Sequence, residues 1–339
     1  MFSGKLEDAL NVHDLRVMAR ARLPKWMFEF VDRGTEDEVA LRNNRAAFER
    51  IKLKPRTLVD VSTRNQEIEF FGHTHKMPIA VAPTGTAGLL WYQGEIALAK
   101  AAAAAGIPFT LATGSQTAME KVAEAVPGAR LWFQLYMWPD RSLSHQLVER
   151  AKNAGFEALV VTVDGAAAGN REYNRRNGFT TPLKLNLRNL IDGALHPRWS
   201  LDVFLRTLLD SGVPRYRNVS HDGNARITDR PAEFQERREE VDWEDFRWLR
   251  CDIKTTSLIA NCLLRQHAAL LRHGHRLLLR RHHRFGLCGL CLGLRLPLHR
   301  FQNPELVEQQ GDHDLAGIGN ILFRYLLARL PQELPDPHQ

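Results

Sequence analysis

Apolar and polar positions along residues 78–164 follow two alternating patterns. Short apolar runs have the length of buried β-strands: "PIAVAP", "IPFTLAT", "LWFQLY" and "ALVVTVD". The stretches between them are typical of helices: "GEIALAKAAAAAG", closed by Gly106, "SQTAMEKVAEAV", opened by Ser115, and "PDRSLSHQLVERAKNAG", ending at Gly155. Strand and helix alternate four times in about 85 residues, which predicts an α/β protein with a parallel sheet, open or closed into a barrel.

The strand "LWFQLY" raises a question about buried polar groups. Its pattern places Leu131, Phe133 and Leu135 on one face and Trp132, Gln134 and Tyr136 on the other. A buried amide or phenol costs free energy unless it is hydrogen-bonded. Either the fold supplies ordinary partners for Gln134 and Tyr136, or a ligand does.

The flanking segments differ from this regular core. Residues 5–50 have a helical pattern, interrupted by "RGTEDE". Residues 165–242 form a polar excursion with one apolar helix, "LHPRWSLDVFLRTLL", and one charged helix, "RPAEFQERREEVDWEDFRWL". Beyond residue 250 the composition changes abruptly: residues 263–300 contain 13 leucines, 8 arginines, 6 histidines and no acid. We therefore divide the chain into residues 1–250 and an atypical Leu/Arg/His-rich tail at 251–339.

Composition and charge exclude only a few classes of protein. Of the 339 residues, 44% are hydrophobic and 25% are charged, which fits a globular protein with a real core. The net charge of +7 is too moderate to imply nucleic-acid binding. The start of the chain lacks the pattern of a signal peptide, and no uncharged stretch reaches the ~18 residues of a membrane helix. We expect a cytoplasmic protein.

Polar groups gather at the ends of the four predicted strands. The ends are Pro83-Thr84-Gly85, Thr113-Gly114-Ser115, the pair Gln134 and Tyr136, and the pair Thr162 and Asp164. In a βα barrel, functional groups lie at the carboxyl ends of the strands. Ordinary capping and turn chemistry explains any one of these ends. Four in succession favour a functional site.

Several motifs, in order, carry a family resemblance over about residues 10–250. "LPKWMFEFVDRGTEDE", "APTGTAG", "LWFQLY", "VVTVDGAAAGNRE" and "LHPRWSLD" together resemble the FMN-dependent α-hydroxy acid dehydrogenases and oxidases. That family includes mandelate dehydrogenase, L-lactate dehydrogenase and glycolate oxidase, and "LHPRWSLD" is most similar to the mandelate dehydrogenase branch. The resemblance implies a (β/α)8 TIM barrel with FMN at the top of the strands.

The resemblance also implies which residues hold the cofactor. Backbone groups of Pro83, Thr84 and Gly85 would line the flavin. The side chains of Gln134 and Thr162 would hydrogen-bond the isoalloxazine ring. On this interpretation, the flavin is the partner that Gln134 needs.

Three further residues acquire roles in substrate chemistry from the resemblance. Tyr136 would hydrogen-bond the substrate hydroxyl or the developing carbonyl, and Arg171 would bind the carboxylate through its planar guanidinium fork. Asp164 would orient a catalytic histidine and stabilise it when protonated. Three of the site residues also have an ordinary alternative: a solvated charge for Arg171, strand chemistry for Thr162 and a core position for Tyr136.

The sequence departs from the family at several positions. Phe30 stands where the family has a tyrosine that touches the substrate carboxylate, and Ala112 stands where it tends to have a serine. Past residue 250 we find no lysine in the context of the flavin N1 contact, since Lys254 lies in "CDIKTTSL". We also find no His-Gly-Gly-Arg segment to supply the general base and the second substrate arginine, and no Gly/Arg phosphate loops. The simplest explanation is a tail translated out of frame or derived from a rearranged gene.

The tail admits two other interpretations. Cys288 and Cys291 near His282 and His283 have the ligand types of a zinc site, but the loops are short and rich in leucine, so we expect no metal. The basic "RRHHR" segment suits nucleic acid or anionic lipid, but it lacks interleaved aromatic residues.

The sequence therefore predicts an oxidoreductase that oxidises an L-2-hydroxy acid, lactate-like or mandelate-like, to a 2-oxo acid through FMN, with this chain impaired. Quinone or O₂ would accept the electrons, and an intact protein would form a homo-oligomer. Peripheral contact with the inner face of the membrane is the alternative location. The alternative function is that of an inactive homologue that acts as a binding or interaction protein.

Overall fold

The computed structural model describes residues 6–163, 169–180, 182–184, 186–219, 225–229, 241–252 and 257–261. The amino-terminal part is helical, as the sequence predicts. Its elements are the 3₁₀ turn η1 (Leu6–Asp8), α1 (Val12–Arg22), α2 (Lys25–Asp32) and α3 (Val39–Arg50). Asn11 caps α1 by accepting a hydrogen bond from the backbone N–H of Asp14, which satisfies one of the free donors of the first turn.

The centre of the described fold is a parallel sheet in the order β3-β4-β5-β8. Its strands are β3 (Phe109–Ala112), β4 (Leu131–Tyr136), β5 (Ala158–Thr162) and β8 (Ser257–Asn261). Three predicted strands are thus confirmed. The predicted strand that comes first in the chain, at residues 78–83, is reduced to one parallel bridge between Val81 and Phe109. Within the described residues it pairs with β3 alone, so fewer ladder hydrogen bonds hold it extended there.

The predicted helices between the strands are all present. They are α5 (Gly94–Ala105), α6 (Met119–Ala125) and α7 (Arg141–Asn153). A short helix that the sequence does not predict, α4 (Ala87–Leu90), precedes α5. The predicted start of the second helix at Ser115 was wrong, because α6 begins at Met119 with Ala118 at the cap position. Ser115 Oγ donates to the carbonyl of Thr117 instead of accepting from a helical N–H, so Ser115 closes a turn before the helix.

The two faces of β4 are buried in different clusters, as its alternation predicts. Leu131, Phe133 and Leu135 belong to the main core. Trp132 packs in a second cluster with Ala158 and other small or aromatic side chains. Burial on both faces explains why the strand is almost continuously apolar.

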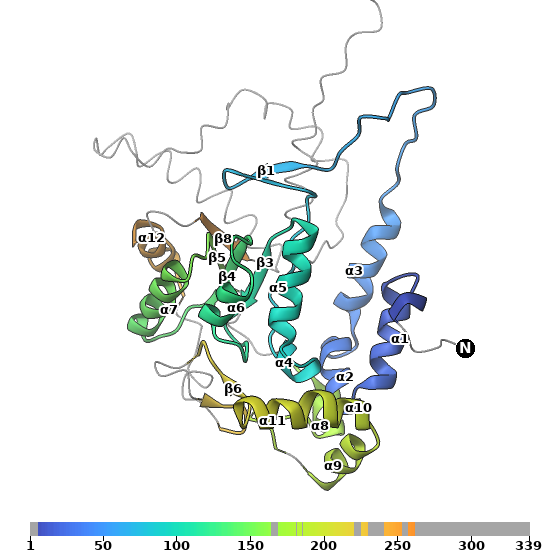
Figure 1. The fold of residues 1–339 in the computed structure, drawn as a ribbon, viewed down its shortest axis with the longest axis vertical. Coiled ribbons are helices and arrows are strands. Elements are labelled where there is room, and N and C mark those ends of the chain that lie inside the picture. The colour runs from blue at the N-terminus through green and yellow to red at the C-terminus, as the bar shows by residue number, and fades with distance from the viewer. Residues whose placement is uncertain are drawn as a thin grey trace, which may run out of the picture.

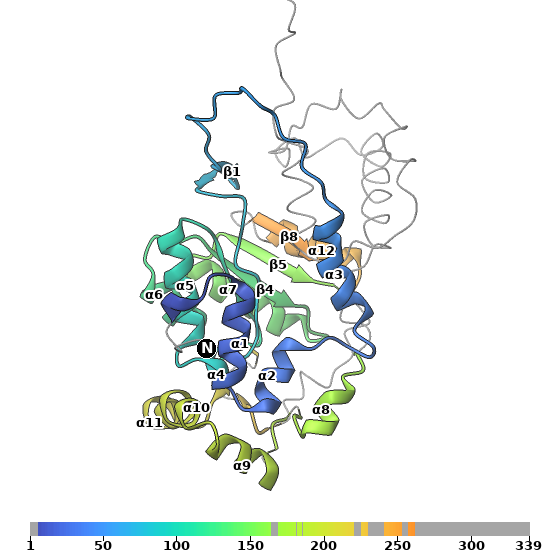
Figure 2. The same ribbon diagram turned by 90° about the vertical axis from the view of Figure 1, so that its right-hand side faces the viewer.

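The antiparallel hairpin and the excursion lie at opposite ends of the molecule (Figures 1 and 2). The hairpin comprises β1 (Ile68–Phe70) and β2 (His73–His75). His73 Nε2 lies 3.4 Å from Glu157 Oε2, immediately before β5, so the hairpin covers the amino ends of the strands. The excursion comprises α8 (Glu172–Asn177), α9 (Leu187–Ala194), α10 (Pro197–Trp199), the π-helical segment η2 (Ser200–Leu205), α11 (Arg206–Ser211), β6 (Arg215–Tyr216) and β7 (Ala225–Arg226), followed by α12 (Trp243–Asp252).

The rest of the predicted barrel, and nearly all of the predicted tail, fall outside the described residues. β8 lies past residue 250 and extends the sheet beside β5, with Asn261 opposite Thr162. Among the described residues, no helix combines the length and apolarity needed to cross a membrane.

Candidate active site

The strand ends that the sequence singles out lie next to one another in the fold. A Cβ atom placed on Gly85 would lie 3.7 Å from the carbonyl oxygen of Gly114. The first two strand ends are therefore side by side. Thr113 is hydrogen-bonded to Gln134, and Gln134 to Thr162. The ends of β3, β4 and β5 therefore form one connected row, with the loop of Pro83 and the exposed Thr84 beside it.

Gln134 obtains two partners from the fold itself. Its side chain is 3% exposed. The amide Oε1 accepts from the Thr113 backbone N–H at 3.1 Å, and Nε2 donates to Thr162 Oγ1 at 3.0 Å. The fold itself therefore supplies hydrogen-bond partners for this buried amide.

The remaining hydrogen-bonding capacity of this pair suits the polar edge of a flavin. A glutamine amide has two N–H donors and two acceptor lone pairs, and only one of each is used by these two contacts. Thr162 Oγ1 accepts from Gln134, so its own hydrogen is free to donate to another group. Adjacent donors at the sheet edge fit a planar ring that presents carbonyl oxygens and ring nitrogens.

Of the two predicted catalytic residues, the structure describes Tyr136 but not Asp164. Tyr136 is half-buried and packs against the main core, and its backbone N–H donates to Thr113 Oγ1 at 3.3 Å. It is thus joined to the same row through Thr113. Asp164 lies outside the described residues, and so do Cys288, Cys291 and the tail histidines.

Arg171 and Phe30 come together, although 141 positions separate them in sequence. Arg171 donates to the carbonyl oxygen of Phe30 at 3.2 Å, and its guanidinium lies 5.2 Å from the centre of the Phe30 ring. The Phe30 ring stacks on Phe179 at 4.2 Å. The guanidinium is exposed and has five donors, of which this contact uses one, so it is able to bind an anion as well.

A charged pair fixes the loop next to Arg171. Arg33 and Glu38 form a salt bridge at 2.9 Å, and the Gly34 backbone N–H also donates to Glu38. The hydrogen bond from Arg33 holds the pKa of the Glu38 carboxyl below its ordinary value. Tyr173, in the same helix as Glu172, donates its hydroxyl hydrogen to the Arg33 carbonyl at 3.1 Å, which ties this loop to α8.

Sequence reasoning missed two residues that hold the loop at 113–118. Glu95 is 1% exposed and accepts from the backbone N–H groups of Gly88 and Gln116 and from the hydroxyl of Thr117. Asn218 is fully buried and donates to Ser115 Oγ at 2.8 Å. Glu95 resembles an ordinary acidic residue in the first turn of a helix, and Asn218 comes from the excursion, so no local signal reveals either contact.

A parallel sheet with polar strand ends joined in a row is an arrangement typical of α/β enzymes. The sequence profile described as FMN-dependent dehydrogenase matches residues 19–272, and the chain belongs to this family. The match continues past residue 250. FMN is therefore the cofactor of the family to which these strand ends belong.

Individual relatives match over part of their length. The chain is 38% identical over 259 residues to the (S)-mandelate dehydrogenase of Pseudomonas putida, covering 76% of this chain and 64% of the relative. It is 44% identical over 199 residues to a putative L-lactate dehydrogenase of Mycobacterium tuberculosis (strain ATCC 25618 / H37Rv), covering 59% of this chain and 48% of the relative. The chain thus spans about half to two thirds of these relatives.

Solved structures also match this chain over part of their length. The crystal structure of the monotopic membrane protein (S)-mandelate dehydrogenase superimposes with a TM-score of 0.70 at 36% identity, covering 78% of this chain and 69% of that one. A mandelate oxidase variant with a C4a-OH-FMN adduct superimposes with a TM-score of 0.56 at 29% identity, covering 77% of this chain and 65% of that one.

Proposed function

We propose that the chain derives from an oxidoreductase that oxidises an L-2-hydroxy acid, lactate-like or mandelate-like, to a 2-oxo acid. The observation that carries this proposal is the row formed by Thr113, Gln134 and Thr162, with unused donors at the carboxyl ends of adjacent parallel strands. FMN, when bound there, supplies the acceptor for the hydride equivalent. The relatives named as mandelate and L-lactate dehydrogenases support the substrate class.

Each residue then has a specific task. Gln134 and Thr162 hold the polar edge of the flavin, and the loop of Pro83, Thr84 and Gly85 lines it through backbone groups. Arg171 binds the substrate carboxylate, because a planar fork suits a planar anion. Tyr136 hydrogen-bonds the substrate hydroxyl, and its half-buried position beside Thr113 supports this role.

We further propose that catalysis by this chain is impaired. Asp164 would orient a histidine base, but no His-Gly-Gly-Arg segment follows in the sequence, and general-base catalysis contributes ~10²–10⁴-fold. The strand beside β5 reads "SLIAN" and carries no lysine to compensate negative charge on a reduced flavin. The domain boundary at residue 250 and the out-of-frame origin of the tail belong to the same proposal. The alternative is an inactive homologue that acts through binding.

The experiment that tests the activity is anaerobic reduction of the flavin-loaded chain. Purified full-length chain, supplied with FMN, is mixed with L-lactate or L-mandelate, and the loss of flavin absorbance is followed. We expect slow bleaching or none. Purification with stoichiometric bound flavin that either substrate bleaches rapidly would contradict the proposed impairment.

A peripheral membrane location is favoured by exposed leucines on the excursion. Leu195 and Leu209 are 74% and 80% exposed, and other apolar side chains are exposed on the same segment: Leu187, Leu190, Ile191, Leu201 and Leu205. Arg188, Arg198 and Arg206 lie among them and would attract anionic headgroups. The structural relative described as monotopic supports this proposal. A membrane quinone, or O₂, would then accept the electrons, and the intact protein would form a homo-oligomer.

A further inference from the structure

The loop at residues 33–38, "RGTEDE", interrupts the amino-terminal helices, and the function proposed above assigns it no task. In the fold it lies against the segment that carries Arg171. The backbone N–H of Glu36 donates to the carbonyl oxygen of Asn170 at 3.0 Å. This hydrogen bond holds the residue immediately before Arg171, so it fixes the backbone where the chain enters that position.

A second hydrogen bond holds the chain just after Arg171. Tyr173 is 8% exposed, and its hydroxyl donates to the carbonyl oxygen of Arg33 at 3.1 Å. The Arg33 guanidinium lies 5.4 Å from the centre of the Tyr173 ring, so the ring contacts the same loop. Arg171 is the N-cap residue of α8, but its side chain caps no backbone N–H of that helix. The loop therefore anchors the start of α8 where a side-chain cap does not.

The loop and this segment approach each other most closely at Gly169. A Cβ atom on Gly169 would lie 2.6 Å from Thr35 Cγ2, which is closer than real Cβ contacts come. Thr35 is β-branched, so its methyl group has little freedom to turn away. The backbone of Gly169 is not in the left-handed region. The fit against Thr35, rather than the backbone conformation, therefore favours glycine at this position.

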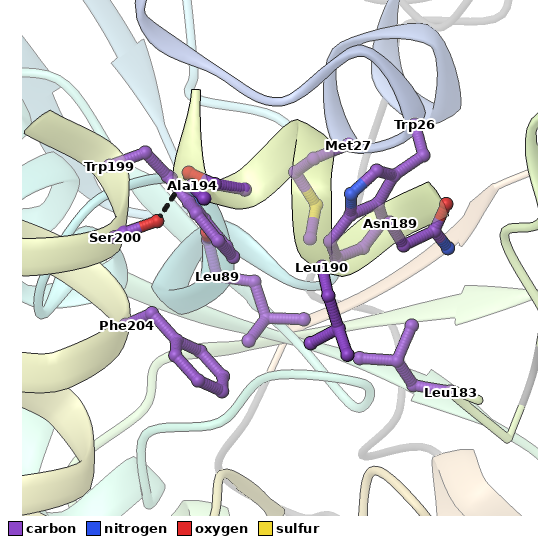
Figure 3. Close-up of a pocket in the computed structure, with 11 residues that line it drawn as sticks. Trp26, Met27, Leu89, Leu183, Asn189, Leu190, Ala194, Trp199, Ser200 and Phe204 are labelled. Atoms are coloured by element: carbon purple, nitrogen blue, oxygen red, sulfur yellow. Dashed lines mark hydrogen bonds between the residues drawn. The ribbon is translucent and has the colours of Figure 1, made fainter. Parts of the chain in front are cut away.

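The side-chain contacts of Arg171 lead instead to a cavity. Its guanidinium donates to the carbonyl oxygen of Phe30 at 3.2 Å. The Phe30 ring stacks on Phe179, and Phe179 stacks on Trp26 with the ring centres 6.0 Å apart. Trp26 lines an apolar cavity of about 260 Å³ (Figure 3). Side chains beside a cavity lack packing contacts on one side, so this stack restrains Arg171 less firmly than the hydrogen-bonded loop does.

We infer that the loop at 33–38 positions Arg171 for the substrate carboxylate. Tyr173 and the close pair of Thr35 and Gly169 act as positioning residues, because they hold the backbone from which the guanidinium projects. A guanidinium makes two parallel hydrogen bonds to a carboxylate only when its plane is correctly placed, so a displaced backbone weakens the pair. The inference rests on the proposed function, which takes Arg171 as the residue that binds the substrate anion.

The test is calorimetric titration of the full-length chain, supplied with FMN, with benzoylformate and separately with its uncharged amide. Arg171 favours the anion, so Arg171→Gln should weaken benzoylformate binding about 10–100-fold and leave amide binding unchanged. Tyr173→Phe keeps the ring, removes the hydroxyl and should weaken benzoylformate binding alone, about 2–10-fold. Tyr216→Phe is the matched control, because Tyr216 is equally buried but lies on β6, and it should bind both probes as the native chain does.

A second pair of variants tests the fit at Gly169 without relying on Tyr173. Gly169→Ala places a methyl group against Thr35 and should weaken benzoylformate binding about 2–10-fold, the equivalent of one hydrogen bond. Thr35→Ser removes the opposing Cγ2 methyl group, so the double variant should recover the native affinity. The melting temperature of each variant reports on stability separately from binding.

The outcomes distinguish this inference from the proposed function. If the native chain does not bind benzoylformate, or if Arg171→Gln binds it equally well, the carboxylate site is wrong and the inference falls with it. If Arg171→Gln weakens binding but Tyr173→Phe and Gly169→Ala do not, the site stands and the inference alone is overturned. Equal losses for benzoylformate and the amide, or a loss in Gly169→Ala that Thr35→Ser does not restore, would also overturn the inference.

Discussion

Gln134 links the local pattern of one strand to the chemistry of the site. Its position on the same face of β4 as Trp132 buries an amide that the fold satisfies in part, through Thr113 and Thr162. Leaving such a group unpaired would cost about 1–3 kcal/mol, so the two threonines hold the amide in one orientation. One amide N–H and the Thr162 hydroxyl hydrogen are not used by these contacts, and a cofactor at the strand ends would use them.

Phe30→Tyr tests the substrate side of the site at the level of one hydroxyl. The Phe30 ring lies beside the Arg171 guanidinium, so a hydroxyl there would add a second donor for a bound carboxylate. A hydrogen bond of about 0.5–1.5 kcal/mol should tighten binding of a 2-oxo acid about 2–10-fold. Calorimetry with pyruvate and benzoylformate measures the change. Phe28→Tyr, on the same helix, is the control, and an equal effect there would argue against a carboxylate site at Arg171.

Glu38 should make part of the stability depend on pH. Its folded pKa lies below the ordinary value of 4.5, through the hydrogen bond from Arg33. The ionised carboxylate therefore stabilises the fold above the unfolded pKa, and this contribution is lost as the pH falls through the folded pKa. We expect Glu38→Gln to lower the melting temperature at pH 7 and to leave it unchanged at pH 3. Asp37→Asn serves as control. A difference of equal size at both pH values would exclude the salt bridge as its cause.

Among the elements, the loop at 113–118 depends on partners from both sides. Glu95 holds it from α5, and Asn218 holds it from the excursion. The loop carries Thr113, which orients Gln134. The two contacts therefore connect the row of strand ends to α5 and to the excursion.

Replacing Glu95 separates the charge of this residue from its hydrogen bonds. Glu95→Ala leaves three partly buried donors without their acceptor, so we expect a loss of about 2–4 kcal/mol in the free energy of unfolding. Glu95→Gln keeps an acceptor oxygen for the two backbone donors, and the Thr117 hydroxyl is able to rotate to accept from the new amide. It should cost about 1 kcal/mol. Urea denaturation measures both, and equal losses would show that charge is the main contribution.

The sequence was informative where burial is two-sided and the contacts are local. β4 was predictable because both of its faces are buried, which gives a short, continuous apolar run. The start of α6 was not predictable, because Ser115 lies in a turn that Asn218, 103 positions away, holds by a hydrogen bond. Glu95 is missed for the same reason, because its partners Gln116 and Thr117 lie more than 20 positions away in sequence. The strand ends were identified because polar residues interrupted an apolar pattern.

For the whole molecule, the exposed leucines and arginines of the excursion predict binding to anionic vesicles that salt weakens. Burying one leucine is worth about 1.5–3 kcal/mol, so the double variant Leu195→Asp, Leu209→Asp should reduce binding at least about tenfold. Leu58→Asp is the control, because Leu58 is 106% exposed but lies outside the excursion. Co-sedimentation with phosphatidylglycerol vesicles gives the measurement. Equal losses in the control and the double variant would contradict a specific membrane face.

The most direct test of the account is a titration of the full-length chain with FMN, followed by quenching of flavin fluorescence. The native chain should bind with a Kd weaker than about 1 μM, because the expected lysine and phosphate loops are not found in its sequence. Thr162→Val should weaken binding by a further 2–10-fold or so, and Thr110→Val, the same exchange within β3, should not. Saturable quenching with this order of affinities would support FMN at the ends of β3, β4 and β5. The absence of quenching, or equal affinities in all three proteins, would contradict it.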